Sequence, residues 1–359
     1  MSRLVVLTEG QTNLHEAKTA VGLLRYRGGD VVALLDSTCA GRTTQEVLGV
    51  GGETPFVSDL ASISADTLVI GIAPPGGQLP QEWRSLLRGA IENGMDIVSG
   101  LHALLGEDPE FAALAKKHGT QVHDLRRAPE NVTVSLDLAR AAPCHRVHTV
   151  GNDVSVGKMV TALELTRELG NRGHQAGFVA TGQTGILIAG EGVAVDHVIS
   201  DFIAGATEAE VVRKQDQEFV VIEGQGSLAN PRYSGVTLGL LHGCAPQTLI
   251  MVYAPTRQEA SGTGVTLPPL KELIRIYEEM ASLLTPCKVV GVAFNPDGLA
   301  SAEAHRRRIE TEAELGLPVT DVIEEGPERL VTAILERHQE LRGEGRLPPA
   351  KDGPQDDSA

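Results

Sequence analysis

The chain has 359 residues, of which 42% are hydrophobic and 22% charged, a composition typical of an ordinary globular protein and one that excludes wholesale disorder. Its 31 basic and 47 acidic residues leave a net charge of −16, and aromatic residues make up only 3%. Proteins that bind nucleic acids or anionic membranes usually carry a basic footprint, and single-strand binders also need aromatic stacking platforms. The composition therefore favours a small-molecule partner, with no nucleic acid and no membrane.

The cysteines and the first residues indicate a reducing compartment. The four cysteines form no C-x-x-C pair and lie far apart, at Cys39, Cys144, Cys244 and Cys287. No apolar run approaches the roughly 20 residues needed to span a bilayer. The chain starts with an apolar strand rather than with the apolar region and cleavage site of a signal peptide. We therefore expect a cytoplasmic protein.

Short apolar runs alternate with helical stretches along the chain, which is typical of parallel sheets covered on both faces. The expected strands are Leu4–Leu7, Val31–Leu35, Thr67–Ile72, Asp96–Ser99, Val147–Val150, Gly177–Ala180, Phe219–Ile222, Thr248–Tyr253, Val289–Phe294 and Val319–Val322. The alternation breaks near residues 125–146, so we expect a domain over residues 1–140, a second over 141–342, and a disordered Pro/Gly-rich tail over 343–359. The fold class is α/β.

The first half is expected to form a Rossmann-like, doubly wound domain. Its second strand ends in Asp36, where a dinucleotide site places the acid that binds a ribose hydroxyl. The first turn, however, carries one glycine rather than G-x-G-x-x-G, so NAD is poorly supported. Asp36 has two interpretations, a contact to a nucleotide or CoA-like ligand and a local cap, and the missing fingerprint favours the cap.

The second half is expected to be a P-loop NTPase-like parallel-sheet domain. Strand Val147–Val150 runs into Gly151-Asn-Asp-Val-Ser-Val-Gly-Lys158 and then a long helix, which is the context in which backbone N–H groups and a lysine hold a phosphate. Met159 stands where a magnesium-binding P-loop has Ser or Thr. The loop is similar to that of dethiobiotin synthetase. Its expected ligand contacts are Gly151, Asn152, Asp153, Val156, Gly157, Lys158 and Met159.

Later turns supply further candidates. Thr181, Gln183 and Thr184 lie in a glycine-rich turn after a strand and are expected to contact the cofactor. Asp196 and Asp201 are metal-ligand candidates if a metal is used, or else helix caps.

Catalytic candidates follow the strand Phe219–Ile222. Glu223 ends that strand and is a candidate base, with Gln225 as a hydrogen-bond donor. His242 is an alternative base if it reaches the pocket, and otherwise a core histidine. Asn295 follows a later strand, at the position where related P-loop proteins often recognise a nucleotide base.

Four segments together resemble a bacterial and archaeal P-loop family, long labelled a domain of unknown function, that includes D-glutamate N-acetyltransferases. These segments are Gly-Asn-Asp-Val-Ser-Val-Gly-Lys-Met, Ala-Thr-Gly-Gln-Thr-Gly-Ile-Leu-Ile-Ala-Gly, Val-Asp-His-Val-Ile-Ser-Asp-Phe-Ile-Ala-Gly-Ala-Thr-Glu and Ile-Glu-Gly-Gln-Gly-Ser-Leu. The resemblance covers nearly the whole chain. Met159 is usual in that family, whereas Asn152 and Val160 depart modestly from its pattern.

The resemblance implies transfer of an acetyl group from acetyl-CoA to the amine of an acidic amino acid, D-glutamate above all. Lys158 would then face a CoA phosphate or a glutamate carboxylate, and Glu223 or His242 would accept the ammonium proton. The alternatives are an ATP-Mg-dependent carboxylate-activating ligase or kinase of the dethiobiotin synthetase kind, and a non-catalytic nucleotide-binding regulator. By analogy with related P-loop enzymes, we also expect a homo-oligomer.

Overall fold

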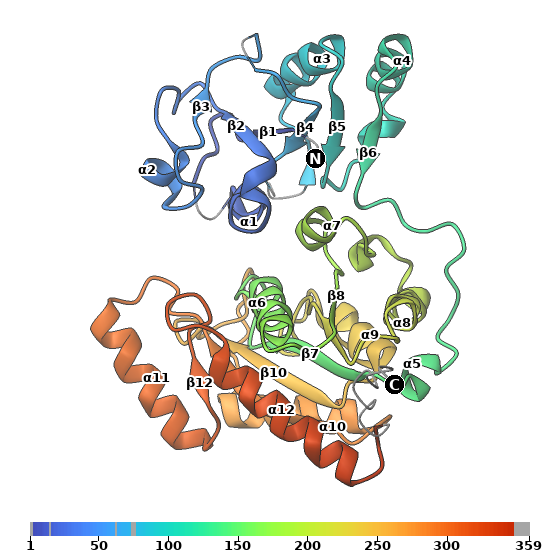
Figure 1. Ribbon diagram of the computed structural model, residues 1–359, viewed down its shortest axis with the longest axis vertical. Coiled ribbons are helices and arrows are strands. Elements are labelled where there is room, and N and C mark those ends of the chain that lie inside the picture. Colours follow the sequence, from blue (N-terminus) through green and yellow to red (C-terminus); the bar gives the residue numbers. More distant parts are fainter. Residues whose placement is uncertain (1–2, 14–15, 62, 73–76, 348–359) are drawn as a thin grey trace, which may run out of the picture. The chain divides into compact units, whose positions relative to one another are not determined.

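The computed structural model describes residues 3–13, 16–61, 63–72 and 77–347. The chain divides into two compact units, one comprising Met1–Pro129 with Gly182–His197 and the other Glu130–Thr181 with Val198–Ala359. Each unit is built on one six-stranded sheet in which all neighbouring strands are parallel (Figure 1). The predicted α/β fold class is therefore confirmed.

The first sheet has the strand order β3-β2-β1-β4-β5-β6, which is that of the dinucleotide-binding Rossmann fold. Its strands are β1 (Leu4–Leu7), β2 (Val31–Leu35), β3 (Phe56–Val57), β4 (Thr67–Ile70), β5 (Asp96–Ser99) and β6 (Val122–Asp124). Its helices are α1 (Lys18–Arg27), α2 (Thr44–Leu48), α3 (Arg84–Glu92), α4 (Pro109–His118) and α7 (Gln183–Ala189). The sequence did not predict β3 and β6, because strands of two and three residues are too short to show a periodicity.

The second sheet has the order β12-β11-β10-β7-β9-β8. Its strands are β7 (His145–Gly151), β8 (Ala176–Val179), β9 (Phe219–Ile222), β10 (Thr248–Tyr253), β11 (Lys288–Phe294) and β12 (Val319–Thr320). Its helices are α5 (Leu138–Ala141), α6 (Lys158–Asn171), α8 (Ile203–Arg213), α9 (Ser234–Cys244), α10 (Leu270–Ser282), α11 (Ser301–Leu315) and α12 (Glu328–Gly343). The central β7 is buried along its whole length, and its carboxyl end carries the P-loop between β10 and β9.

Helix α7 belongs to the first unit although the sequence before and after it belongs to the second. Leu187 of α7 is buried in the same apolar cluster as Leu23 and Leu24 of α1. Arg27 of α1 also donates from Nη1 to the Leu187 carbonyl oxygen at 2.9 Å. Burial of the apolar face of α7 is the physical reason for this placement.

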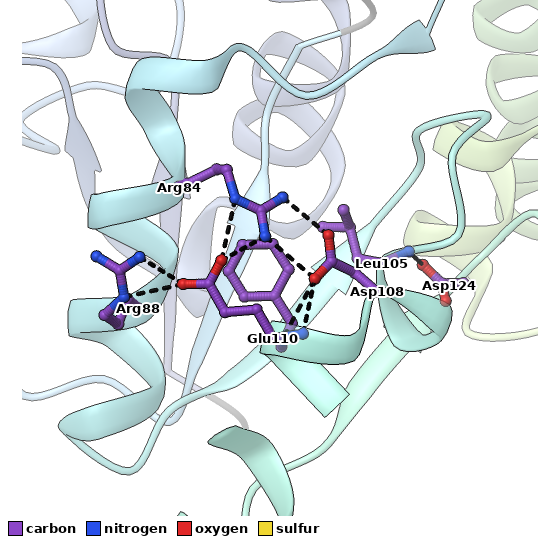
Figure 2. Close-up of polar contacts among 7 residues, drawn as sticks. Arg84, Arg88, Leu105, Asp108, Glu110 and Asp124 are labelled. Atoms are coloured by element: carbon purple, nitrogen blue, oxygen red, sulfur yellow. Dashed lines mark hydrogen bonds and ion pairs between the residues drawn. The ribbon is translucent and has the colours of Figure 1, made fainter. Parts of the chain in front are cut away.

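Charged side chains join α3 to α4 in the first unit (Figure 2). Arg84 binds Asp108 through Nη1 at 2.8 Å and also pairs with Glu110, which in turn pairs with Arg88. The guanidinium of Arg84 lies over the Phe111 ring, 4.4 Å from its centroid. These contacts hold the pKa values of Asp108 and Glu110 below their usual range. Because every charge in this cluster has a partner, we interpret it as structural.

Buried histidines link α12 to the amino ends of the strands in the second sheet. His145 of β7 and His338 of α12 stack at 5.2 Å, with their Nδ1 atoms 3.2 Å apart. His145 Nε2 also lies 2.7 Å from Thr248 Oγ1. Burial lowers the pKa of His145 well below its usual value and that of His338 to about 4. Both rings are therefore neutral at pH 7.

The chain end and the surface add two observations. Part of the segment predicted to be a disordered tail follows α12 as a turn, in which Arg346 Nη2 donates to the Pro286 carbonyl oxygen at 2.7 Å. The rest of that segment, residues 348–359, lies outside the described residues. Within the part of the chain that the structure describes, no helix is long and apolar enough to cross a membrane.

Candidate functional site

The P-loop connects the carboxyl end of β7 to the first residue of α6. Ser155 has φ 57° and Gly157 has φ 110°, so the chain makes a left-handed turn just before the helix. A Cβ atom on Gly151 would stand 2.9 Å from Val156 Cγ2 and 3.2 Å from Lys158 Nζ. Both glycines are therefore required, Gly157 for its conformation and Gly151 for the close approach of the lysine.

Lys158 is buried at the start of α6, with 6% of its surface exposed. Its Nζ donates to the Asp153 carbonyl oxygen at 2.8 Å, and within the described residues this is the one hydrogen bond of the ammonium group. Burial lowers its pKa to about 8, although the charges of Asp153 and Glu223 act in the opposite direction. An ammonium group has three donors. The unused donors at the helix N-terminus fit a phosphate anion.

Hydrogen bonds from neighbouring loops fix the conformation of the P-loop. Asn152 exchanges two hydrogen bonds with the backbone of Ala254, both 3.1 Å long. The Asp153 carboxylate accepts from Asn230 Nδ2 and from the Ser261 N–H, each at 2.8 Å. Both side chains are thus engaged by the protein itself, and their contact with a ligand stays a prediction.

Two further residues brace the same turn. Asn295 Nδ2 donates to the Val156 carbonyl oxygen at 2.8 Å, and its Oδ1 accepts from the Asp297 N–H at 3.0 Å. Asn295 therefore braces the P-loop in this arrangement, and its contact with a nucleotide base stays a prediction. Tyr277 donates from its hydroxyl to the Gly151 carbonyl oxygen at 3.0 Å. Tyr277 could not be recognised from the sequence, because a buried tyrosine on α10 reads as one of the apolar positions of an amphipathic helix.

Glu223 lies beside Lys158, with 4% of its surface exposed. Its Oε2 accepts from the Thr181 N–H at 2.9 Å, and its Oε1 accepts from Gln225 Nε2 at 3.0 Å. A Cβ atom on the next residue, Gly224, would stand 3.0 Å from Lys158 Cδ. The structure therefore brings together four of the predicted site residues, Thr181, Glu223, Gln225 and Lys158. Gln225 orients the Glu223 carboxylate.

His242 lies at the other edge of the second sheet. Helix α9 starts near the P-loop, where Thr237 Oγ1 donates to the Gln225 carbonyl oxygen at 2.9 Å, and it ends just before the amino end of β10. His242 is in the last turn of α9, with Nε2 3.2 Å from the Met280 carbonyl oxygen. Since all strands of the sheet are parallel, this end is opposite to the P-loop. His242 is therefore not brought to the site as a base.

Gln183 and Thr184 follow Thr181 directly in sequence but belong to the first unit. Gln183 Nε2 donates to Thr19 Oγ1 at 2.8 Å, and the Thr19 and Thr184 hydroxyl oxygens are 3.0 Å apart. The predicted Thr-Gly-Gln-Thr turn is thus divided between two units. Cofactor contact by Gln183 and Thr184 stays a prediction.

The two candidate metal ligands do not form a common site within a unit. Asp196 belongs to the first unit and forms an ion pair with Arg126, whereas Asp201 belongs to the second and is exposed. Among the residues that the structure describes, no group of three or more His, Cys, Asp or Glu side chains could hold a metal ion.

Asp36 is fully buried at the end of β2. Its Oδ1 accepts from the N–H and the hydroxyl of Thr38, at 2.9 and 2.6 Å, and its Oδ2 accepts from the Thr12 hydroxyl. Glu9 joins the loop after β1 to the loop after β2, because its carboxylate accepts hydrogen bonds from the N–H and the hydroxyl of Ser37. These contacts support the cap interpretation of Asp36 over a ligand contact.

A Rossmann-ordered sheet in one unit and a P-loop sheet in the other define a two-part α/β P-loop protein. The chain belongs to the DUF1611 family. Residues 37–128 match its domain of unknown function described as Rossmann-like (DUF1611_N), and residues 134–331 match the one described as a P-loop domain (DUF1611_C). The family resemblance seen in the sequence is confirmed.

Relatives with known names cover most of the chain. It is 39% identical over 320 residues to a D-glutamate N-acetyltransferase of Tritonibacter scottomollicae, which covers 89% of this chain and 94% of the relative. It is 36% identical over 280 residues to a D-glutamate N-acetyltransferase of Pseudoalteromonas sp, a match that covers 77% of this chain and 84% of that relative. The crystal structure of a DUF1611 family protein from Anabaena variabilis matches with a TM-score of 0.88 at 39% identity, over 94% of this chain and 100% of that one.

Proposed function

We propose that this protein is a D-glutamate N-acetyltransferase that uses acetyl-CoA as the acetyl donor. The observation that carries the proposal is the buried Lys158, whose ammonium group has unused donors, beside the buried carboxylate of Glu223. This arrangement can hold an anionic donor and accept a proton without a metal. The named relatives, similar over most of their length, support the same activity.

The chemistry assigned to these residues is acyl transfer. Lys158 and the N-terminus of α6 bind a phosphate group of CoA. Glu223 accepts the proton that the substrate ammonium group must lose, and the freed amine nitrogen attacks the thioester carbonyl carbon. The new amide bond forms as the C–S bond breaks, and the CoA thiolate leaves and takes up the second proton that the nitrogen loses. Thr181 and Gln225 keep the Glu223 carboxylate in its orientation through the bonds described above.

Met159 agrees with a reaction that consumes no ATP. It follows Lys158 at the position where a P-loop that binds magnesium carries a hydroxyl. A phosphate anchored without being hydrolysed does not need that ligand.

The test is release of free thiol from acetyl-CoA, measured with D-glutamate, L-glutamate and aspartate, with and without ATP-Mg. We expect thiol release with D-glutamate at a rate that does not depend on ATP-Mg or on a chelator. The opposite pattern would be ADP formation that requires an added carboxylate, with no thiol released. That result would replace the proposal with the ATP-dependent ligase.

A further inference from the structure

The loop after β9 carries an arginine, Arg232, that the chemistry above does not use. Its backbone N–H donates to Asn230 Oδ1 at 3.1 Å. The same Asn230 side chain donates from Nδ2 to Asp153 Oδ1 at 2.8 Å. The backbone of Arg232 is therefore positioned by a side chain that is itself bonded to the P-loop.

The Arg232 guanidinium lies against a glycine of the neighbouring loop. Gly262 has φ 72°, and a Cβ atom there would stand 2.3 Å from Arg232 Nη1. The residue before it, Ser261, donates its N–H to Asp153 Oδ2 at 2.8 Å. Arg232 is thus connected to Asp153 along two paths, through Asn230 and through Ser261, and both ends of the arginine are near the P-loop.

The guanidinium group of Arg232 has no charged partner among the described residues. Within the described ranges, its guanidinium forms no hydrogen bond and no ion pair, and the residue is exposed. Arg257, on the loop after β10, differs because its Nε lies 3.1 Å from Asp297 Oδ2. In a chain with a net charge of −16, an unpaired guanidinium beside the P-loop is a distinctive feature. It fits an anion that arrives from solution.

The chemistry of a guanidinium group narrows the choice of anion. Its planar fork matches a carboxylate or a phosphate, either of which it can bind through two parallel hydrogen bonds, and the phosphate of CoA is already assigned to Lys158 and the N-terminus of α6. The α-carboxylate of an amino acid is attached to the same carbon as the reacting amine, so it must stay close to Glu223. The side-chain carboxylate of glutamate lies several bonds further from the amine and needs a cationic partner of its own, and Arg232 is on the same loop between β9 and α9 that carries Glu223. We propose that Arg232 binds the side-chain carboxylate of the acidic amino-acid substrate, an assignment that rests on the proposed function.

The experiment compares Arg232→Gln and Arg232→Lys with the unsubstituted protein. For Arg232→Gln, we expect KM for D-glutamate to rise about 10- to 100-fold, since hydrogen bonds to charged groups contribute roughly 1.5–3 kcal/mol. KM for acetyl-CoA should stay the same. D-Glutamine, which lacks the side-chain charge, should be used about equally by both proteins, so the preference for glutamate over glutamine collapses. Arg232→Lys should recover part of it, because the charge remains but the fork is lost.

Two further variants separate a local effect from a general one. Gly262→Ala should raise KM for D-glutamate without removing any charge, because the new methyl group displaces the guanidinium. Arg275→Gln on α10 removes a similarly exposed arginine that is paired with Glu279, and it should change neither KM. A rise in KM for acetyl-CoA instead of D-glutamate would assign Arg232 to CoA and overturn the proposal, as would unchanged constants.

Direct binding of D-glutamate, measured by calorimetry, keeps the two proposals distinguishable. If the protein binds D-glutamate through Arg232 but transfers no acetyl group, the proposed activity is contradicted and the role of Arg232 is supported. If acetyl transfer is intact and Arg232→Gln binds D-glutamate normally, only the Arg232 assignment falls. If the unsubstituted protein neither binds nor acetylates D-glutamate, both fall.

Discussion

The carboxyl edges of the two sheets have the same layout but use their polar groups differently. In the first sheet, Asp36 accepts hydrogen bonds from Thr12 and Thr38, and Glu9 accepts from Ser37, so the loops after β1 and β2 bind each other. In the second sheet, by contrast, the Lys158 ammonium group donates one hydrogen bond to the P-loop backbone, and its other two donors have no partner within the described residues.

The two edges differ in how many hydrogen-bond donors and acceptors remain without a partner in the protein. Two sheets with every neighbouring strand pair parallel both present the ends of their strands to possible ligands. A buried ammonium group with unused donors is costly unless an anion neutralises it. A buried carboxylate with three local donors has no such need. The ligand edge is therefore recognised by unused donors and acceptors, and the strand order alone does not identify it.

The largest expected effect comes from exchanging an acid for its amide at each edge. Glu223→Gln should lower kcat by about 10²- to 10⁴-fold, the usual contribution of a general base. The affinity for acetyl-CoA should change far less, because a base acts chiefly in the transition state. Steady-state kinetics together with calorimetry measures both.

Asp36→Asn is the matched control at the other edge. It exchanges an equally buried acid for its amide, and it should leave kcat and acetyl-CoA affinity unchanged at a temperature where the protein is folded. A large loss of kcat in Asp36→Asn, or none in Glu223→Gln, would contradict the contrast between the two edges.

The next effect concerns the unused donors. Lys158→Met should weaken acetyl-CoA binding about 100-fold, the loss expected for one or two charge-assisted hydrogen bonds. The melting temperature of the ligand-free variant is measured in parallel, because the substitution also removes a positive charge that Asp153 and Glu223 favour. Lys271→Met, on the exposed start of α10, is the control.

The pH dependence of binding sharpens the same point. The lysine binds an anion in its protonated form, and its pKa in the free protein is about 8. The affinity for acetyl-CoA should therefore change little up to about pH 7. It should fall as the pH rises through 8, because the lysine then loses its proton. In Lys158→Met this fall should disappear. Calorimetric titrations at several pH values measure it, and a fall that persists in the variant would assign it to another group.

The smallest effect belongs to the amino edge of the second sheet, where polar groups serve the fold. His145 and His338 are neutral in the folded protein, because burial lowers both pKa values, whereas an unfolded chain protonates histidine near 6.5. Their contribution is therefore fully present above about pH 6.5 and is lost as the pH falls toward 4. Arg342 and His174 oppose protonation of His338, and Glu218 favours it.

Urea unfolding at pH 7.5 and pH 5 measures this loss. We expect the free energy of unfolding to drop by up to about 4 kcal/mol, about 2 kcal/mol for each ring, since pH 5 lies roughly 1.5 pKa units below 6.5 and one unit corresponds to about 1.4 kcal/mol. His338→Gln should reduce the drop because it removes one titrating ring. An equal drop in His338→Gln would show that other groups cause it.

How far the sequence predicts this molecule depends on the range of the contact. The P-loop and its flanking strand and helix are local, so their residues were predictable from Gly151 to Lys158. The position of Glu223 at the same edge of the sheet as Lys158 was also accessible, because the ends of neighbouring parallel strands meet at one edge.

Contacts set by long-range packing could not be predicted. His242 follows Glu223 closely in sequence, but a helix of 11 residues carries it to the opposite edge. Gln183 lies two residues after Thr181, yet the apolar face of α7 is buried in the first unit. Asn230 and Tyr277 act through buried polar contacts, and nothing in their local sequence distinguishes such residues from ordinary loop and core positions.

The return of α7 to the first unit has a consequence for how this protein can evolve. Neither unit is encoded by one uninterrupted stretch, because the chain passes between them after Pro129, after Thr181 and after His197. A single recombination point anywhere between β1 and β12 would separate Leu187 from Leu23 and Leu24, or divide one of the sheets. The Rossmann-like unit cannot be exchanged as a module in the way that consecutive domains are. The two halves are therefore inherited together, in keeping with relatives that match this chain across both.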